Sequence, residues 1–198
     1  MAFFSQTGFE PKRKFRFLID FTSFGGGLQI MATKCSKPTY ELTGVTEHRV
    51  LNHQFKFPGI IKWNDIDVSF IDAIEPNIGS KFYNALRNAG YVEPVAANDL
   101  VTGITKQSAH ITLGEVKIKQ LTGGGTSVIG GAGDATPAAP LPTNWSDEWV
   151  LKNAFIKSVA FGELDYNSED IVGIDVGIVY DYATYIPGPV PLQELASE

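Results

Sequence analysis

The clearest alternation of apolar and polar residues in the chain runs from residue 171 to residue 182. One phase holds Val172, Ile174, Val176, Ile178, Tyr180 and Tyr182, and the other holds Gly173, Asp175, Gly177 and Asp181. A period of two over this length is typical of a half-buried β-strand. The preceding run, residues 149–161, keeps Leu151, Phe155, Val159 and Phe161 in phase, and the polar residues 162–170 connect the two runs. The pattern predicts two long, adjacent antiparallel strands.

Three further segments alternate in the same way. Residues 14–21 set Phe15, Phe17, Ile19 and Phe21 against polar neighbours, and after a turn at residues 25–27 the expected hairpin partner is residues 28–34. Residues 65–70 place Ile66, Val68 and Phe70 inward and Asp65, Asp67 and Ser69 outward. Residues 109–121 also alternate, but the phase changes at Gly114, which indicates a β-bulge.

Residues 76–90 carry the only strong helical period that we find in the sequence. Phe82, Ala85, Leu86 and Ala89 form one apolar stripe, with Ser80 as the expected N-cap and Gly90 as the expected stop. Residues 91–108 are expected to form a loop. The sequence therefore predicts a mainly β fold, with about six or more antiparallel strands in a sandwich or barrel and one α-helix.

The segment from residue 35 to residue 59 does not alternate cleanly. It contains Pro38, Pro58, two histidines and the aromatic residues Tyr40, Phe55 and Phe57. Connections this long are uncommon in compact domains and are usually either functional or disordered. The aromatic content argues against disorder. We therefore expect a long, functional loop between two strands.

Composition favours a β-rich protein whose surface is partly covered in an assembly. The chain of 198 residues is 43% hydrophobic, only 19% charged and contains 20 Gly, which is enough for one domain over residues 1–198. Three stretches fall outside the expected core: a flexible arm at 1–13, a Gly/Ala/Pro-rich insertion at 122–143 and an extended Pro-rich tail at 186–198. No apolar run reaches the ~18 residues of a membrane span, and the N-terminus does not resemble a secretory signal.

Catalytic, metal and cofactor signatures are not found in the sequence. The glycine runs at 25–27 and 123–125 are not followed by Gly-Lys-Ser/Thr, and His48 and His53 have no acidic partner at ligand spacing. Cys35 is the only cysteine, which excludes a disulfide within the chain and a thiolate cluster. The aspartates that could be paired as acid and base are explained more simply as the polar faces of strands. We expect a protein that is not an enzyme and that has no metal or cofactor.

Two regions of the sequence resemble tail tube proteins of contractile-tailed bacteriophages. The first region has Trp-x-Leu-Lys-x-Ala-Phe-Ile from Trp149, Gly-Glu-Leu-Asp-Tyr-x-Ser from Gly162, and Val-Tyr-Asp-Tyr ending at Tyr182. The second region has Tyr-Glu-Leu-Thr-Gly from Tyr40, His-Gln-Phe-Lys-Phe-Pro-Gly from His53, and the strand pattern from Trp63 to Asp72. The insertion at 122–143 departs from the shorter form of that family.

The resemblance implies a structural protein of the virion, made in the host cytoplasm. In that family six copies close into a ring, and stacked rings form a tube inside a contractile sheath, through which DNA passes during ejection. The implied partners are further copies of the chain, the sheath protein, and baseplate and tail terminator proteins, with no membrane. The segment from 35 to 59 then corresponds to the extension that contacts the neighbouring ring, and its candidate contact residues are Tyr40, Leu42, Val45, His48, Val50, Phe55 and Phe57.

The acidic residues of two strands are the candidates for the wall of the lumen. These residues are Asp65, Asp67, Asp175 and Asp181, with Gly173 and Gly177 beside them. A net charge of −6 argues against general adhesion to nucleic acid, which requires basic residues, but it suits a channel that must not hold DNA. Lys62, Lys117, Lys119 and Lys157 complicate this interpretation because some of them could pair with the acids.

Two other functions remain open from the sequence. The chain could form the tube of a related machine, such as a type VI secretion system or a phage-tail-like bacteriocin. It could instead be a β-sandwich that binds carbohydrate or a host surface, with Tyr40, Phe55, Phe57 and Trp63 as exposed aromatic residues on loops.

Overall fold

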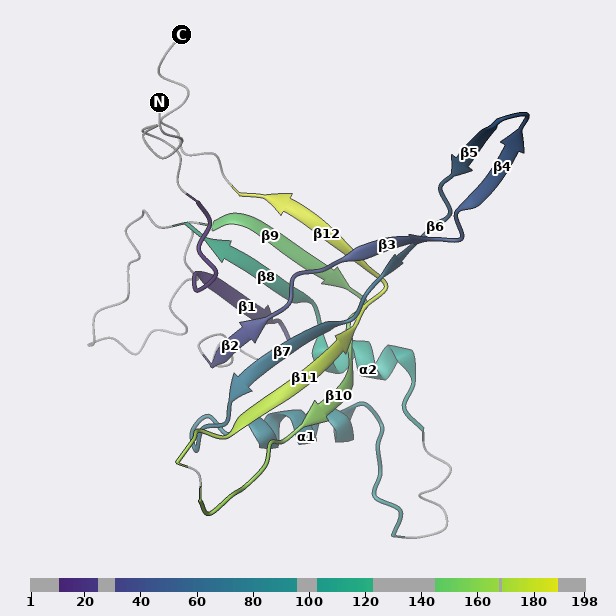
Figure 1. Cartoon of the computed structure of the whole chain (residues 1–198). Coiled ribbons are helices and arrows are strands. Elements are labelled where there is room, and N and C mark those ends of the chain that lie inside the picture. The colour runs from purple at the N-terminus through teal and green to yellow at the C-terminus, as the bar shows by residue number, and fades with distance from the viewer. Residues whose placement is uncertain (1–10, 25–30, 96–102, 123–144, 168, 189–198) are drawn as a thin grey trace, which may run out of the picture.

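Two antiparallel four-stranded sheets pack face to face in the computed structural model, which describes residues 11–24, 31–95, 103–122, 145–167 and 169–188 (Figure 1). The first sheet has the order β1 (Phe17–Phe21), β8 (Val116–Leu121), β9 (Trp145–Lys152) and β12 (Tyr182–Pro187). The second sheet has the order β10 (Phe155–Ala160), β11 (Gly173–Val179), β7 (Ile66–Ile71) and β2 (Ala32–Cys35). The predicted mainly β sandwich is confirmed.

The two long strands predicted near the C-terminal end are each divided between the two sheets. The chain passes from β9 to β10 through Asn153, whose φ is 55°, and the buried Ala154. It passes from β11 to β12 through Tyr180 and Asp181, and the Asp181 N–H donates to the Lys152 carbonyl at 3.1 Å. The predicted antiparallel pairing is confirmed between β10 and β11. The prediction of two uninterrupted strands is wrong, because each chain segment bends and continues in the other sheet, where β9 pairs with β12.

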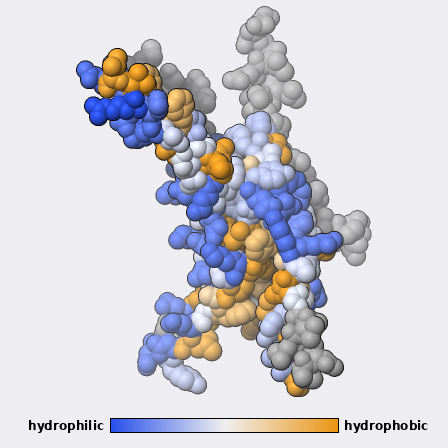
Figure 2. All heavy atoms as spheres, turned by 90° about the vertical axis from the view of Figure 1, so that its right-hand side faces the viewer, coloured by the Kyte–Doolittle hydropathy of each residue, from blue (hydrophilic) through white to orange (hydrophobic). Residues whose placement is uncertain are grey.

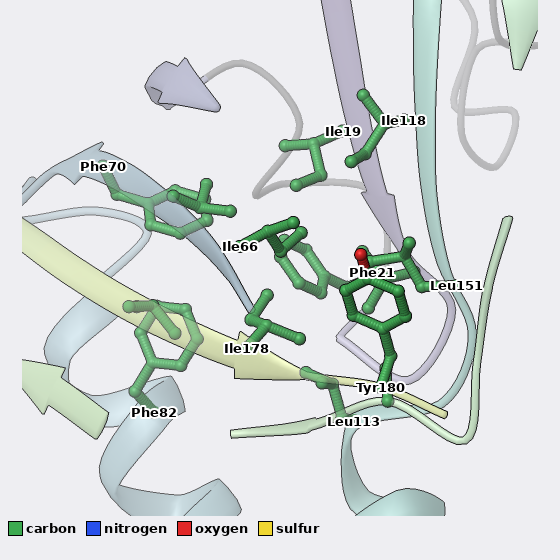
Figure 3. Close-up of a cluster of buried hydrophobic side chains, with 14 of the residues drawn as sticks. Ile19, Phe21, Ile66, Phe70, Phe82, Leu113, Ile118, Leu151, Ile178 and Tyr180 are labelled. Atoms are coloured by element: carbon green, nitrogen blue, oxygen red, sulfur yellow. The ribbon is translucent and has the colours of Figure 1, made fainter. Parts of the chain in front are cut away.

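The core lies between the sheets and confirms the predicted inward faces of several strands. Figure 3 shows side chains of the first sheet meeting those of the second, with helical residues beside them. The buried cluster includes Ile19, Phe21, Ile118 and Leu151 from the first sheet and Ile66, Phe70, Val176 and Ile178 from the second. Phe15, Phe161 and Tyr182 were expected in phase with this core but are exposed, because they lie outside the strands or beyond a corner.

Strand β2 does not form the predicted hairpin with β1. Its register places Ala32 opposite Phe70 and Cys35 opposite Val68, so β2 is an edge strand beside β7. Strand β1 instead pairs with β8, with Ile19 opposite Ile118. The prediction was wrong because neighbours in sequence only tend to be neighbours in a sheet, and here the chain crosses to the other layer.

Two helices are present among the described residues, one more than predicted. Helix α1 (Ile78–Asn88) buries Ile78, Phe82 and Ala85, and its N-cap is Asn77, not Ser80, because the Asn77 side chain accepts the Ser80 N–H at 2.7 Å. Helix α2 (Lys106–Leu113) occupies part of the segments expected to be loop and strand, and it ends at Gly114 with a φ of 72°. The phase change at Gly114 therefore marks a helix end and not a β-bulge.

The segment predicted as an irregular loop is a long β-hairpin. Its strands are β3 (Tyr40–Thr43), β4 (Thr46–Val50), β5 (His53–Phe57) and β6 (Ile60–Trp63). Strand β3 pairs with β6 and β4 pairs with β5, so two ladders follow one another and project away from the sandwich (Figure 1). We call residues 40–63 the arm.

The three predicted appendages lie mostly outside the described residues. Only residues 11–13 of the N-terminal stretch, residue 122 of the insertion and residues 186–188 of the tail are described. Of these, Ile186 and Pro187 belong to β12, so the predicted tail begins inside a strand. Among the described residues, neither helix has the length and apolar character needed to cross a membrane.

Candidate assembly surfaces

The arm has one apolar face and one charged face, although both are exposed to solvent. Cross-strand pairs on the apolar side include Tyr40 with Trp63, Leu42 with Ile61 and His48 with Phe55. On the other side Lys62 pairs with Glu41 at 3.7 Å and Lys56 pairs with Glu47 at 3.3 Å. Alternation of this kind normally directs one face of a hairpin toward a core. The arm has no such core within the described chain, because every residue of β3, β4 and β5 is exposed.

All seven residues that the sequence predicted for ring stacking lie on the arm and are exposed; they are Tyr40, Leu42, Val45, His48, Val50, Phe55 and Phe57. The sequence interpretation missed three further exposed apolar residues, of which Leu51 is 88% and Ile60 is 79% exposed, with Ile61 beside Ile60. The two adjacent isoleucines directly after Pro58-Gly59 are the sequence signal for Ile60 and Ile61. Figure 2 shows hydrophobic side chains next to strongly hydrophilic ones at the tip of the projecting arm.

The root of the arm is held to the body by three aromatic rings. The Trp63 ring centroid lies 5.4 Å from that of Tyr40 and 6.1 Å from that of Tyr180. The Asn64 N–H donates to the Thr39 carbonyl at 2.9 Å and closes the base of the hairpin. Tyr180 is buried at the corner between β11 and β12, and this burial, with a smaller contribution from Asp65, raises the pKa of its phenol to about 12. The arm therefore starts from an ordered platform.

The junction between the two ladders requires glycine at one position. A Cβ atom on Gly59 would lie 1.8 Å from the Thr43 carbonyl oxygen and 2.6 Å from that of Gly44. Any side chain there would force the two chain segments apart. The close approach at Gly59 therefore maintains the continuity of the arm from its root to its tip.

Three of the four predicted lumen residues gather on the outward face of the second sheet or at its edge. Asp67 lies opposite Gly177 on the next strand, and Asp175 lies opposite Ser69, whose hydroxyl donates to it at 2.5 Å. Asp65 forms an ion pair with Lys157 at 2.7 Å, and this bond raises the pKa of the Lys157 ammonium. Gly173, Gly177 and Ser158 leave part of this face without large side chains, whereas Lys34 lies opposite Ser69 and is exposed on the same face. The face is thus polar and carries both acidic and basic groups.

The fourth residue, Asp181, lies apart from the other three. It follows the end of β11 and accepts hydrogen bonds from Lys106 of α2 at 2.7 Å and from Asn153 at 2.8 Å. These bonds, led by the one from Lys106, lower the pKa of Asp181. The expectation that Asp175 and Asp181 line one uninterrupted strand is therefore wrong.

The basic residues that complicated the lumen interpretation are engaged in local contacts. Lys62 and Lys157 form the ion pairs described above, and Lys117 lies 3.8 Å from Glu115. Lys119 lies over the Trp145 ring, 5.9 Å from its centroid. Across the described ranges, no three His, Cys, Asp or Glu side chains come together as possible ligands for a metal ion.

Solved structures with a similar fold come from contractile injection systems. No protein-family model and no curated protein sequence matches the chain. A chain of the cryo-EM structure of the anti-feeding prophage (AFP) baseplate aligns with a TM-score of 0.59 at 13% identity, covering 91% of this chain and 99% of that one. A chain of the AFP tube terminating cap gives 0.57 at 17%, covering 95% and 100%. A chain of the PVC sheath–tube complex, from an extracellular contractile injection system, gives 0.55 at 17%, covering 89% and 92%.

The chain has the fold of tube and terminator proteins of contractile injection systems. This agrees with the resemblance to phage tail tube proteins noted in the sequence. At identities below 20% the likeness concerns the fold, so the roles of the arm and of the acidic face are inferred from this chain's own residues.

Proposed function

We propose that the chain is the tube protomer of a contractile tail, in which six copies close into a ring and rings stack into a tube. The observation that carries the proposal is the projecting arm, with an apolar face that nothing in the described chain covers, on a fold shared with a chain of a sheath–tube complex. Exposed apolar patches of this kind mark protein interaction sites. A two-stranded hairpin is also only marginally stable alone, so the arm gains stability from a partner.

Ring closure uses the open edges of the two sheets. Strands β1 and β12 are the edges of the first sheet, and β10 and β2 are the edges of the second. Edge strands present unpaired backbone groups that must be paired or blocked. Pairing an edge of one copy with the opposite edge of the next is a head-to-tail contact, and such contacts close into rings when the rotation allows it. A ring of six follows the sixfold symmetry stated for the AFP baseplate.

The outward face of the second sheet is the proposed wall of the lumen. Asp67 and Asp175 supply negative charge there, Asp65 is balanced by Lys157, and Gly173 and Gly177 keep the face smooth. Basic residues bind nucleic acid by neutralising phosphates and releasing counterions, so an acidic wall lets DNA pass without holding it. In this role the protein is part of the virion, is made in the host cytoplasm, and contacts sheath, baseplate and tail terminator proteins.

A second candidate is the tube of an injection system that is not a phage. The solved structures of similar fold favour it, since one of them is described as an extracellular contractile injection system. Ring and tube formation would be the same in both cases. The cargo would differ, because a phage tail conducts DNA and the other machines do not need to.

Electron microscopy of the purified full chain tests the proposal. We expect rings or tubes in negative stain, and light scattering after gel filtration should give six times the monomer mass for isolated rings. A chain that stays monomeric over a wide range of protein concentration and salt would contradict the proposal. DNA-filled tails that contain the protein would then decide between the two candidates.

A further inference from the structure

A second exposed apolar surface lies on the loop between β10 and β11. Its largest apolar side chains are almost fully accessible: Leu164 is 90% exposed and Ile171 is 74% exposed, with Phe161 and Tyr166 beside them. The neighbouring Ile74 is 98% exposed, and it is brought close because the Asp72 N–H donates to the Val172 carbonyl at 2.9 Å. We call the described residues 161–167 and 169–172, together with Ile74, the acceptor loop.

The acceptor loop and the arm lie at opposite ends of the same strand. The loop leads into β11 at Gly173, and β11 ends just before Tyr180, on which the root of the arm packs. In Figure 1 the arm projects at the upper right, while the connection between β10 and β11 lies at the lower left. The two apolar surfaces therefore cannot cover each other within one molecule. They are placed to meet between copies arranged head to tail.

The charges of the two surfaces are complementary. Residues 161–172 contain the acidic residues Glu163, Asp165, Glu169 and Asp170 and no basic residue. The arm has three basic residues and two acidic ones, and Lys56 and Lys62 are already paired with its own glutamates. Among the ion pairs between described residues none involves Arg49, whose Nε donates to the Leu51 carbonyl at the tip. Arg49 thus offers a positive charge where the arm ends.

We propose that the arm tip of one copy docks on the acceptor loop of a copy in the next ring. The apolar side chains around Leu51 and Phe55 cover Leu164, Ile171 and Ile74, and Arg49 faces the carboxylates of Glu163 and Glu169. This inference rests on the proposed function, and it assigns the surface that receives the arm. Because the contact joins two different surfaces, it repeats along one direction and sets the polarity of the tube.

Charge reversal tests the pairing. We expect Arg49→Glu, or Glu163→Arg together with Glu169→Arg, to raise the protein concentration needed for tubes by about tenfold or more, because each of six contacts per ring becomes repulsive. Combining all three changes in one chain should restore tubes, since every contact regains opposite charges. Arg87→Glu on the exposed side of α1 is the matched control and should assemble normally.

Cross-linking gives an independent measurement of the contact. The native Cys35 thiol does not compete, because it is partly buried and that burial raises its pKa to about 12. Under mild oxidation, Leu51→Cys with Leu164→Cys in one chain should give a ladder of linked multimers on a non-reducing gel. Each single variant should give dimers at most.

The outcomes separate this inference from the proposed function. If Arg49→Glu forms tubes as readily as the wild-type chain, the docking assignment is wrong and the tube proposal stands. The same holds if the chain that combines all three charge reversals forms tubes no better than the variants that carry one side of the reversal. Tubes of the double cysteine variant that give no ladder would overturn it as well. A wild-type chain that remains monomeric would overturn both.

Discussion

Replacing Trp63 with alanine should release the arm while leaving the sandwich folded. Trp63 is the last residue of β6, and its ring contacts Tyr40 on the arm and Tyr180 on the body. An aromatic pair contributes about 0.5–1.5 kcal/mol beyond the area that it buries, so losing the cross-strand pair with Tyr40 and the pair with Tyr180 destabilises the root of the arm by about 1–3 kcal/mol. This corresponds to an opening equilibrium raised about 5- to 150-fold. The melting temperature should fall by only a few degrees, because Trp63 lies at the margin of the core.

Hydrogen exchange measured by mass spectrometry checks this prediction on the monomer. Peptides covering residues 40–63 should exchange faster in Trp63→Ala by the factor given above, while peptides from β7 and β11 should keep their protection. Phe55→Ala is the control, because it removes an exposed aromatic residue near the tip without touching the root. Unchanged exchange in Trp63→Ala, or an equal increase in Phe55→Ala, would refute the idea that the three rings hold the arm.

Three further predictions concern the junction of the arm, the acidic face and one buried carboxylate. Gly59→Ala should abolish tubes because the new Cβ would collide with the Thr43 carbonyl, and it should leave the thermal unfolding of the body nearly unchanged. Gly103→Ala is the control, since a Cβ there meets nothing within 4 Å, and normal tubes from Gly59→Ala would contradict the prediction. Asp67→Lys with Asp175→Lys should still form tubes, but DNA release should slow and become strongly salt-dependent; release at the normal rate would show that this face does not line the lumen. Asp147→Asn should lower the free energy of unfolding by about 1–3 kcal/mol at neutral pH, measured by denaturant titration at several pH values.

The pH dependence of the Asp147 effect follows from the contacts of the carboxylate. Burial would raise its pKa, but the hydrogen bond from Ser146 and the ammonium groups of Lys12 and Lys37, at 3.0 and 3.4 Å, outweigh burial and hold the pKa below its ordinary value of 3.8. A depressed pKa means that the stabilisation is complete above pH 3.8 and is lost as the pH falls through the folded-state pKa. The difference between wild type and Asp147→Asn should therefore shrink below about pH 4. A difference that stays constant down to pH 2 would contradict this assignment.

Alternation along the chain predicted which side chains are buried better than it predicted how strands are connected. The inward residues of β1, β7 and β11 follow it closely because burial of one face is what sets a period of two. The same period carries no information on which sheet a strand joins. The corners at Asn153 and at Tyr180–Asp181 were missed for that reason, and so was the placement of β2 beside β7.

Helix α2 was missed because its helical period is short. It spans eight residues, of which only Leu113 is buried, so no apolar stripe was available to identify it. What marks it is local chemistry: the side chains of Thr105 and Ser108 each accept the backbone N–H of the other in a capping box. Gly114 then ends the helix with a left-handed φ. Thr105, Ser108 and Gly114 are therefore the sequence signals of this helix.

The arm and the acceptor loop show why sites of assembly are harder to predict than a core. The sequence interpretation gave the segment 35–59 as a functional loop that contacts the neighbouring ring, but it treated residues 162–170 only as a polar connection between two strands. Yet Ile60 and Leu51 on the arm, and Leu164 and Ile171 on the loop, are large apolar residues in segments where solvent-facing polar residues would suffice. Leaving such side chains exposed costs solubility and contributes nothing to the fold of a monomer. Their presence at both ends of β11 is what the proposed docking of the arm on the acceptor loop of a neighbouring copy would require.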